Sequence, residues 1–342
     1  MLKKILKSNK ILVVLLIVGV LSFLLSGLDR TNWVYSVKDI GGSEVVSGPD
    51  IYLILLDEYP GSNPLCGYDN SRFTQGLEEL GFYVPEVSYT NYPRTDMLLS
   101  SMLNMDYLDL AGGNSLPKVL DLSLYQDTLV NRILQSIGYT TIHLGSSWTG
   151  TMDNPYASVS LVQSKNPYDN WEKVFPFQVE SLKLIPEVPG STFTFMHNLG
   201  AHLPYIFPPE GGVLESINPP QRKLDQIAYV SSCVLDAVQE VLEKSEVAPI
   251  IIVMSDHGVF HPDYSIYSTE EITCRLNHFF SVYLPEGASS TFPDGPVNYF
   301  RYIFNTYFGM NFSYLPSEHY YVTDWDIDPY ILVEVTDILE VR

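Results

Sequence analysis

The chain has few basic residues, and this shortage limits the classes of protein to which it can belong. Its 342 residues include 19 Lys and Arg against 40 Asp and Glu, which gives a net charge of −21. A surface this acidic argues against a nucleic-acid partner, because binding of phosphates depends on Lys and Arg. The charge suits a secreted or surface domain that is kept soluble by self-repulsion.

Cysteine is also scarce, and its spacing excludes a zinc-ribbon type of site. The three cysteines are Cys66, Cys233 and Cys274. An oxidising compartment permits one disulfide among them and leaves one thiol over. Cys233 falls in a helical pattern, which predicts a buried side chain that acts as a small hydrophobe. Internal repeats and low-complexity tracts are absent as well, so a repeat architecture is not expected.

One long apolar run lies near the N-terminus. Ile11–Leu28 has 18 residues without a charge and follows four lysines. This length spans a bilayer as a helix, and the preceding lysines place the N-terminus in the cytoplasm. A cleaved signal peptide is the alternative, with Ser26 and Gly27 as candidates for its small cleavage-site residues. We expect a retained single-pass anchor in the cell membrane, with the following layout: a basic cytoplasmic tail at 1–10, a transmembrane helix at 11–28, a stalk at 29–48 and an extracytoplasmic globular domain at 49–342.

The globular part alternates strand-like apolar runs with helical patterns. This alternation predicts an α/β domain whose mostly parallel sheet is flanked by helices. The segment 146–190 interrupts the rhythm and is rich in Asn, Pro, Ser, Tyr and Trp, which predicts a loop-rich insertion and a candidate substrate lid. The expected strands are 51–58, 82–87, 139–144, 192–196, 249–255, 278–284 and 330–335, and the expected helices are 68–80, 95–104, 129–137, 221–244 and 298–308.

Two of these runs end abruptly in acids. Ile51–Glu58 reads IYLILLDE, and Ile250–Gly258 reads IIIVMSDHG. Apolar runs without polar alternation are typical of strands buried on both faces, and ligands bind beyond the carboxyl ends of such strands. Asp57, Asp256 and His257 are therefore expected in one crevice, where two carboxylates and an imidazole suit a divalent metal. The alternative is that these acids only begin loops.

A hydroxyl suited to nucleophilic attack precedes the second helical pattern. In NYPRTDMLLSSMLNM, Thr95 stands where a helix should begin. The first turn of a helix carries unpaired N–H groups and the positive end of the dipole, and so it attracts phosphate or sulfate. Beside a divalent cation the hydroxyl can ionise and attack. The alternative is that Thr95 is an ordinary N-cap.

The segments ILLDE, NYPRT, GAHLPY and SDHG, in this order, resemble the alkaline phosphatase superfamily. The resemblance is closest to its sulfatase-like branch, which includes lipoteichoic acid synthases and phosphoethanolamine transferases. LNHFFSVYLP, followed by PVNYFRYIFNTYFG, resembles membrane-anchored sulfatase-like proteins. The match spans roughly residues 49–320 and implies an alkaline-phosphatase-like catalytic domain.

The resemblance implies a set of metal ligands. An acid after the first strand, a threonine and an Asp-His pair hold the metal in that branch, which here are Asp57, Thr95, Asp256 and His257. Glu58 is adjacent to Asp57 and competes with it for the ligand role. We expect one tightly held divalent ion, with Mn²⁺ or Zn²⁺ favoured and Mg²⁺ or Ca²⁺ left open.

The resemblance also implies residues that contact the substrate. His202, in AHLPY, matches a histidine that touches the phosphoryl group, and it is expected to donate or shuttle a proton. His143 is a second substrate-contacting candidate, for which a satisfied core histidine is the alternative. His197 is expected to orient a ligand or His202, and His261 to be a loop residue. Arg94 is a candidate for pairing with a substrate anion, although an exposed loop arginine is the default.

One departure from the family bears on the reaction. True sulfatases carry a Cys-x-Pro-Ser-Arg motif that this chain lacks, because Cys66 stands in LCGYD. We therefore expect a phosphoryl or phosphodiester hydrolase or transferase with Thr95 as nucleophile. Its substrate would be a phosphate ester such as a lipid head group or a surface glycan phosphate. The alternatives are a sulfuric ester hydrolase and a non-catalytic surface-binding module of the same fold, for which the 24 tyrosines would suit glycan contact.

Overall fold

The computed structural model describes residues 34–37, 48–109, 113–163, 171–214, 220–260, 265, 267–286 and 292–340. The expected transmembrane helix at 11–28 and the expected loop residue His261 lie outside these residues. Among the helices that are described, none combines the length and hydropathy needed to cross a bilayer. The chain divides into two compact units, and each is described by itself. Unit 1 comprises 1–55, 131–252 and 283–285, and unit 2 comprises 56–130, 253–282 and 286–342.

Unit 1 is built on a sheet whose strands follow the order β1-β5-β4-β6-β2, with the first half of β7 next to β2. β4 runs parallel to β5 and to β6, with His143 opposite Ser160 and Phe195. β1 pairs antiparallel with β5, so the predicted stalk segment contains an edge strand. The strands are β1 (Val34–Val37), β2 (Ile51–Leu56), β4 (Thr140–Leu144), β5 (Val159–Val162), β6 (Thr192–Asn198) and β7 (Ile250–Ser255).

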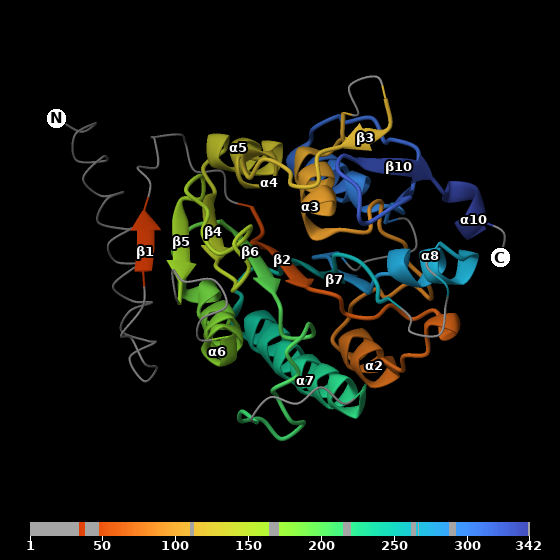
Figure 1. The fold of residues 1–342 in the computed structure, drawn as a ribbon. Helices are drawn as coiled ribbons and strands as arrows, with labels where there is room; N and C mark the ends of the chain where they lie inside the picture. Colours follow the sequence, from red (N-terminus) through yellow and green to blue (C-terminus); the bar gives the residue numbers. More distant parts are fainter. Residues whose placement is uncertain are drawn as a thin grey trace. The chain divides into compact units, whose positions relative to one another are not determined.

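Helices cover the strands of unit 1. α6 (Trp171–Leu182) packs against β6 and against α7 (Pro220–Lys244). In Figure 1 α6 and α7 lie on one side of β4 and β6, and α5 (Leu129–Ser136) lies on the other. Apolar side chains along one face of α7 are buried, with Val234 and Val238 fully covered. Every residue of β2 and β7 is buried, which explains why their sequences do not alternate.

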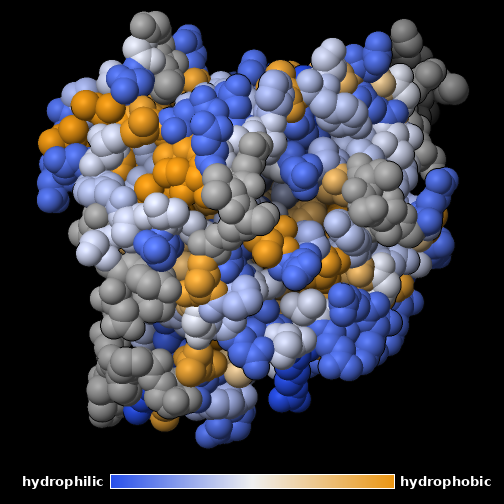
Figure 2. All heavy atoms as spheres, turned by 90° about the vertical axis from the view of Figure 1, so that its right-hand side faces the viewer, coloured by the Kyte–Doolittle hydropathy of each residue, from blue (hydrophilic) through white to orange (hydrophobic). Residues whose placement is uncertain are grey.

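Unit 2 contains the second half of β7 next to β8 (Phe280–Tyr283) and a small antiparallel sheet in the order β3-β10-β9. A disulfide joins Cys66 to Cys274, which lies in α8. Hydrophobic and hydrophilic residues are interspersed over the face shown in Figure 2. The remaining helices and strands are η2 (Pro64–Cys66), α2 (Ser71–Glu79), α3 (Thr95–Asn104), β3 (Ser115–Leu116), α4 (Ser123–Gln126), η3 (Ile185–Glu187, in unit 1), α8 (Thr269–Leu276), η4 (Pro296–Asn298), α9 (Tyr299–Phe308), β9 (Tyr320–Val322), β10 (Tyr330–Glu334) and α10 (Thr336–Glu340).

The mostly parallel sheet with flanking helices was predicted and is confirmed, but three local predictions are wrong. The expected strand at 82–87 is reduced to a single bridge between Tyr83 and Val282, because Pro85 has no N–H to continue a ladder. The expected loop insertion at 146–190 contains β5 and α6, whose short length and internal Pro176 hid their patterns. Cys233 is half-buried on α7 and not in the core.

Candidate metal centre

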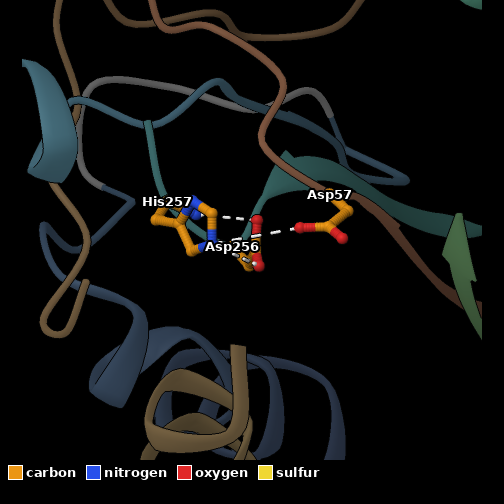
Figure 3. A group of neighbouring side chains, drawn as sticks. All are labelled: Asp57, Asp256 and His257. Atoms are coloured by element: carbon orange, nitrogen blue, oxygen red, sulfur yellow. Dashed lines mark hydrogen bonds and ion pairs between the residues drawn. The ribbon is translucent and has the colours of Figure 1, made fainter. Parts of the chain in front are cut away.

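Three potential metal ligands lie together in unit 2. Asp57 directly follows β2, and Asp256 and His257 directly follow the neighbouring strand β7. One oxygen of each carboxylate and one ring nitrogen lie within 4.8 Å of one another. Figure 3 shows the three side chains converging from the ends of these segments. The structure therefore brings together the residues that the two apolar runs predicted to be neighbours.

Asp256 is the centre of the local hydrogen-bond network. Its Oδ1 accepts the backbone N–H of Glu58 at 3.0 Å and that of His257 at 2.9 Å. Its Oδ2 accepts the hydroxyl of Thr95 at 2.6 Å and lies 3.1 Å from His257 Nε2. The carboxylate is fully buried. Because two backbone donors hold Oδ1, Oδ2 is oriented toward the hydroxyl and the imidazole.

Thr95 is the first residue of α3 and is not its N-cap. The N-cap position belongs to Arg94, whose side chain makes no capping bond. The Thr95 hydroxyl is directed instead to Asp256 Oδ2. The N-cap alternative therefore does not explain this threonine, and its hydroxyl is in contact with the group of potential ligands.

The hydrogen bonds of His257 define its tautomer. Nδ1 donates to the Gly258 carbonyl at 2.9 Å, which leaves the lone pair on Nε2. Nε2 lies 3.9 Å from Asp57 Oδ1. Burial, and after it the charge of Arg275, lower the pKa of His257 to about 4. The imidazole is thus neutral at physiological pH, as a metal ligand must be.

The electrostatics of the centre favour a bound cation. Burial, and next the negative charge of Asp256, raise the pKa of Asp57 well above its usual value. Two buried carboxylates this close cannot both ionise cheaply without a positive partner. Two carboxylates, an imidazole lone pair and a hydroxyl are a donor set that suits Zn²⁺ or Mn²⁺. The residues present therefore fit the divalent ion that the motifs implied.

Glu58 does not take the place of Asp57 in this group. Its backbone has a φ of 55°, and its N–H is directed to Asp256. Among the described residues the potential ligand group contains Asp57 and not Glu58. The side chain of Glu58 still contributes negative charge that helps to raise the pKa of Asp57.

Arg275, at the end of α8, was not identified from the sequence. Its guanidinium is buried and donates to the carbonyls of Pro93 and Gly258, both at 3.1 Å. Its Nη2 lies 3.2 Å from His257 Nε2. A basic residue directly before the apolar segment LNHFFSVYL was the available signal, but nothing in the sequence pairs it with the acids.

His143 and His197 belong to a separate buried network in unit 1. His143 Nε2 donates to the Thr151 carbonyl at 2.8 Å, and its ring stacks on Phe195. Burial lowers the pKa of His143 to about 4. His197 Nδ1 bonds with the Thr151 hydroxyl at 2.7 Å, and its ring meets the edge of Trp148. These contacts favour the reading of His143 as a core histidine over substrate contact.

The remaining candidates differ in accessibility. His202 is half-buried in unit 1, and its Nδ1 donates to the Leu203 carbonyl at 2.9 Å. Arg94 pairs with Asp96 at 2.7 Å, donates to the Lys118 carbonyl and lies over the ring of Tyr330. The Arg94 guanidinium is thus engaged within the protein, which does not favour it as an anion receptor.

Comparisons with known proteins show the fold. Neither a scan against protein-family models nor a search of curated proteins gave a match. Among solved structures, the C-terminal periplasmic domain of EcEptC from Escherichia coli has a TM-score of 0.58 at 15% identity and covers 90% of this chain and 96% of that one. A zinc complex of that domain has a TM-score of 0.56 at 12% identity, with coverages of 88% and 94%.

Two further structures carry the same fold. The soluble domain of lipooligosaccharide phosphoethanolamine transferase A from Neisseria meningitidis has a TM-score of 0.50 at 13% identity, with coverages of 81% and 91%. A protein in the alkaline phosphatase superfamily from Vibrio parahaemolyticus has a TM-score of 0.51 at 12% identity, with coverages of 81% and 72%. The resemblance indicated by the motifs is thereby confirmed at the level of the fold.

Proposed function

We propose that this protein is a metal-dependent enzyme that transfers a phosphoryl group from a phosphate ester through Thr95. One observation carries the proposal: the Thr95 hydroxyl, at the start of α3, donates at 2.6 Å to an acid that shares a ligand group with Asp57 and His257. A hydroxyl in this setting is placed both to be activated and to attack.

Asp57, Asp256, His257 and the oxygen of Thr95 would hold the metal. The mixed oxygen and nitrogen donors favour Zn²⁺ or Mn²⁺, and a similar domain is known in complex with zinc. When bound, a divalent ion lowers the pKa of a neighbouring hydroxyl and offsets the negative charge that develops in the reaction. It would also compensate the two buried carboxylates.

The chain's own groups perform the remaining tasks. Asp256 Oδ2 holds the hydroxyl proton of Thr95 and orients the oxygen, while Oδ1 is anchored by backbone donors. The N–H groups of the first turn of α3 would stabilise the phosphoryl oxygens. Thr95 Oγ1 gives its proton to Asp256 Oδ2 and forms a bond to phosphorus as the bond to the leaving oxygen breaks. His202, the proton donor predicted from the sequence, would give the leaving oxygen its proton. Water or an acceptor hydroxyl then attacks phosphorus, gives its proton to neutral His202, and releases Thr95, which takes back the proton from Asp256.

The substrate class follows from the chemistry and from the similar proteins. A phosphodiester with a glycerophospho- or ethanolamine-phospho-type head group, or a surface glycan phosphate, suits both. One of the similar structures is a periplasmic domain, and another is the soluble domain of a phosphoethanolamine transferase. The disulfide of this chain also suits an oxidising compartment. We therefore assign the domain to the outside of the membrane, to which the segment 11–28 would anchor it. A sulfuric ester is the less favoured substrate, because the chain lacks the Cys-x-Pro-Ser-Arg motif of sulfatases.

Substitution of Thr95 tests the proposal. Thr95→Ala should be folded and inactive on a generic phosphodiester such as bis(4-nitrophenyl) phosphate, and Thr95→Ser should retain measurable turnover. Ser101→Ala is the matched control, because it removes a buried hydroxyl from the same helix away from the site. Mass spectrometry of Thr95 after acid quenching should detect the phosphorylated residue.

The outcomes separate the alternatives. Near-wild-type turnover in Thr95→Ala would exclude the covalent mechanism and favour a water nucleophile. Hydrolysis of 4-nitrophenyl sulfate in preference to the phosphodiester would support the sulfatase reading. Stoichiometric metal binding without turnover on either ester would support a binding module.

A further inference from the structure

The last turn of α8 contacts the segments that carry the proposed metal ligands and the nucleophile. Arg275 donates through Nε to the carbonyl of Pro93, two residues before Thr95. It donates through Nη1 to the carbonyl of Gly258, the residue after His257. One side chain thus bridges Pro93 and Gly258, which are 165 positions apart in the sequence.

Gly258 is held by Arg275 from both of its backbone groups. Its N–H donates to the Arg275 carbonyl at 2.8 Å, and its carbonyl accepts from the Arg275 guanidinium at 3.1 Å. A Cβ at this position would lie 2.0 Å from the Cys274 carbonyl oxygen, so the close approach requires glycine. The backbone after His257 is therefore docked directly on the end of α8.

This docking acts on His257 through a shared acceptor. The Gly258 carbonyl accepts both the Nδ1–H of His257 and the Nη1–H of Arg275. A backbone carbonyl on Nδ1 fixes the tautomer and the ring direction of a histidine ligand and so sets where the Nε2 lone pair points. Nη2 of Arg275 donates to Nε2 at 3.2 Å, a contact that holds the ring direction in the absence of metal and that a bound ion would replace.

The three acceptors around position 275 require the shape of an arginine side chain, and a positive charge alone would not satisfy them. The planar guanidinium reaches two carbonyls and one imidazole with separate donors, whereas lysine offers one ammonium on a flexible stem. The guanidinium carbon also lies 4.1 Å from the centre of the Phe260 ring, which restrains the plane of the fork. Arg275 is thus held in one orientation by contacts on its edge and its face.

We propose that Arg275 is a positioning residue for the metal centre, which sets His257 for metal binding and aligns the segment of Thr95 with it. The proposal rests on the proposed function, because it gives Arg275 a role in the same site. It makes Arg275 neither a metal ligand nor a substrate contact.

The test is metal binding by the full chain in the absence of substrate. Arg275→Lys keeps the charge but loses the fork. We expect its affinity for Zn²⁺ and Mn²⁺, measured by calorimetry on metal-stripped protein, to fall about 10- to 100-fold, as is typical for groups that orient a ligand. The turnover number should fall over a similar range, and the thermal midpoint without metal should also fall, because lysine leaves some of the three buried acceptors without a donor.

Arg301→Lys is the matched control. Arg301 also donates to backbone carbonyls in unit 2, those of Met105 and Ser313, but contacts no residue of the centre. We expect it to keep the wild-type metal affinity. Loss of thermal stability in Arg275→Lys with unchanged metal affinity would overturn the proposal and leave Arg275 a purely structural residue.

Phe260→Leu provides a second arm, which holds even if Arg275→Lys does not fold. Phe260 is 44% exposed, so its truncation does not open the core. Loss of the ring should weaken metal binding by about two- to fivefold through the loosened guanidinium. Unchanged affinity in this variant would also count against the proposal. If the wild type itself binds no metal, the proposed function fails; if the wild type binds and both variants bind equally well, only the role of Arg275 fails.

Discussion

Asp256→Asn should change the stability of the metal-free and metal-loaded protein in opposite directions. In the metal-free protein the carboxylates of Asp256 and Asp57 lie within 4.8 Å and are buried. At that separation two unit charges repel by at least about 3.5 kcal/mol at an effective dielectric constant of about 20. Burial, and next the charge of Asp256, raise the pKa of Asp57, so uptake of a proton would relieve part of this repulsion. We therefore expect Asp256→Asn to raise the free energy of unfolding of the metal-free protein by only a part of the full repulsion, about 1–3 kcal/mol.

The substitution should leave the local backbone in place. An amide oxygen at the Oδ1 position still accepts the N–H groups of Glu58 and His257, so no buried donor loses its partner. The amide nitrogen takes the place of Oδ2 and faces the Thr95 hydroxyl, which can rotate to accept from it. With metal present, however, Asp256→Asn lacks one anionic ligand, and most of the stabilisation by metal should disappear.

Thermal unfolding with a chelator, and then with excess Zn²⁺ or Mn²⁺, measures both effects. The variant should melt a few degrees above the wild type without metal and below it with metal. Asp96→Asn is the contrasting control, because the Asp96 carboxylate is buried against Arg94 at 2.7 Å and its loss should destabilise under both conditions. The reasoning is refuted if Asp256→Asn is destabilised without metal and still gains the full wild-type increment with metal.

Three further predictions concern other parts of the chain. Burial lowers the pKa of His143 from 6.5 to about 4, so the free energy of unfolding that is present above pH 6.5 is lost as the pH falls toward 4. Urea unfolding should therefore show that His143→Gln loses about 2 kcal/mol less than the wild type between pH 7 and pH 5. The double variant Cys66→Ser, Cys274→Ser should lose up to about 5 kcal/mol of unfolding free energy in denaturant titrations, because the disulfide closes a loop between residues 208 positions apart, whereas Cys233→Ser should not. His202→Ala should lower phosphodiester turnover about 100-fold with unchanged metal affinity by calorimetry, and an equal loss of metal affinity would contradict its role as proton donor.

The parts of the fold that could be predicted from the sequence are those in which a local pattern records burial. Ile51–Leu56 and Ile250–Ser255 are continuous apolar runs because both faces of each strand are covered. Their polar residues come only where the strands end, and this alone placed Asp57 and Asp256 at one edge. The helix at Thr95–Asn104 was also predicted with its observed bounds, since its apolar spacing persists from the first turn to the last.

The elements that were missed depend on partners distant in the sequence. β5 has only four residues, and one of them is a serine, Ser160, whose hydroxyl donates to Asp153 at 2.6 Å. Polar residues that are satisfied inside the fold look like loop residues in a sequence. β3 has two residues and is a strand only because β10 pairs with it from more than 200 positions away. No local pattern can indicate a pairing of that kind.

Arg275 shows the same limit at the site itself. Its role arises from acceptors at Pro93 and Gly258, which no periodicity connects to position 275. The sequence did hold an indirect indication, because a chain so poor in basic residues places one arginine directly before an apolar strand. A guanidinium is rarely buried without acceptors to satisfy it. The two acids predicted to meet at the ends of β2 and β7 needed positive charge nearby. That charge could come from a buried arginine or from a metal ion. The structure places this arginine where its charge interacts with both acids and where its Nη2 donates to Nε2 of His257, so the centre combines a fixed cation with a set of donors that suits a second, exchangeable one.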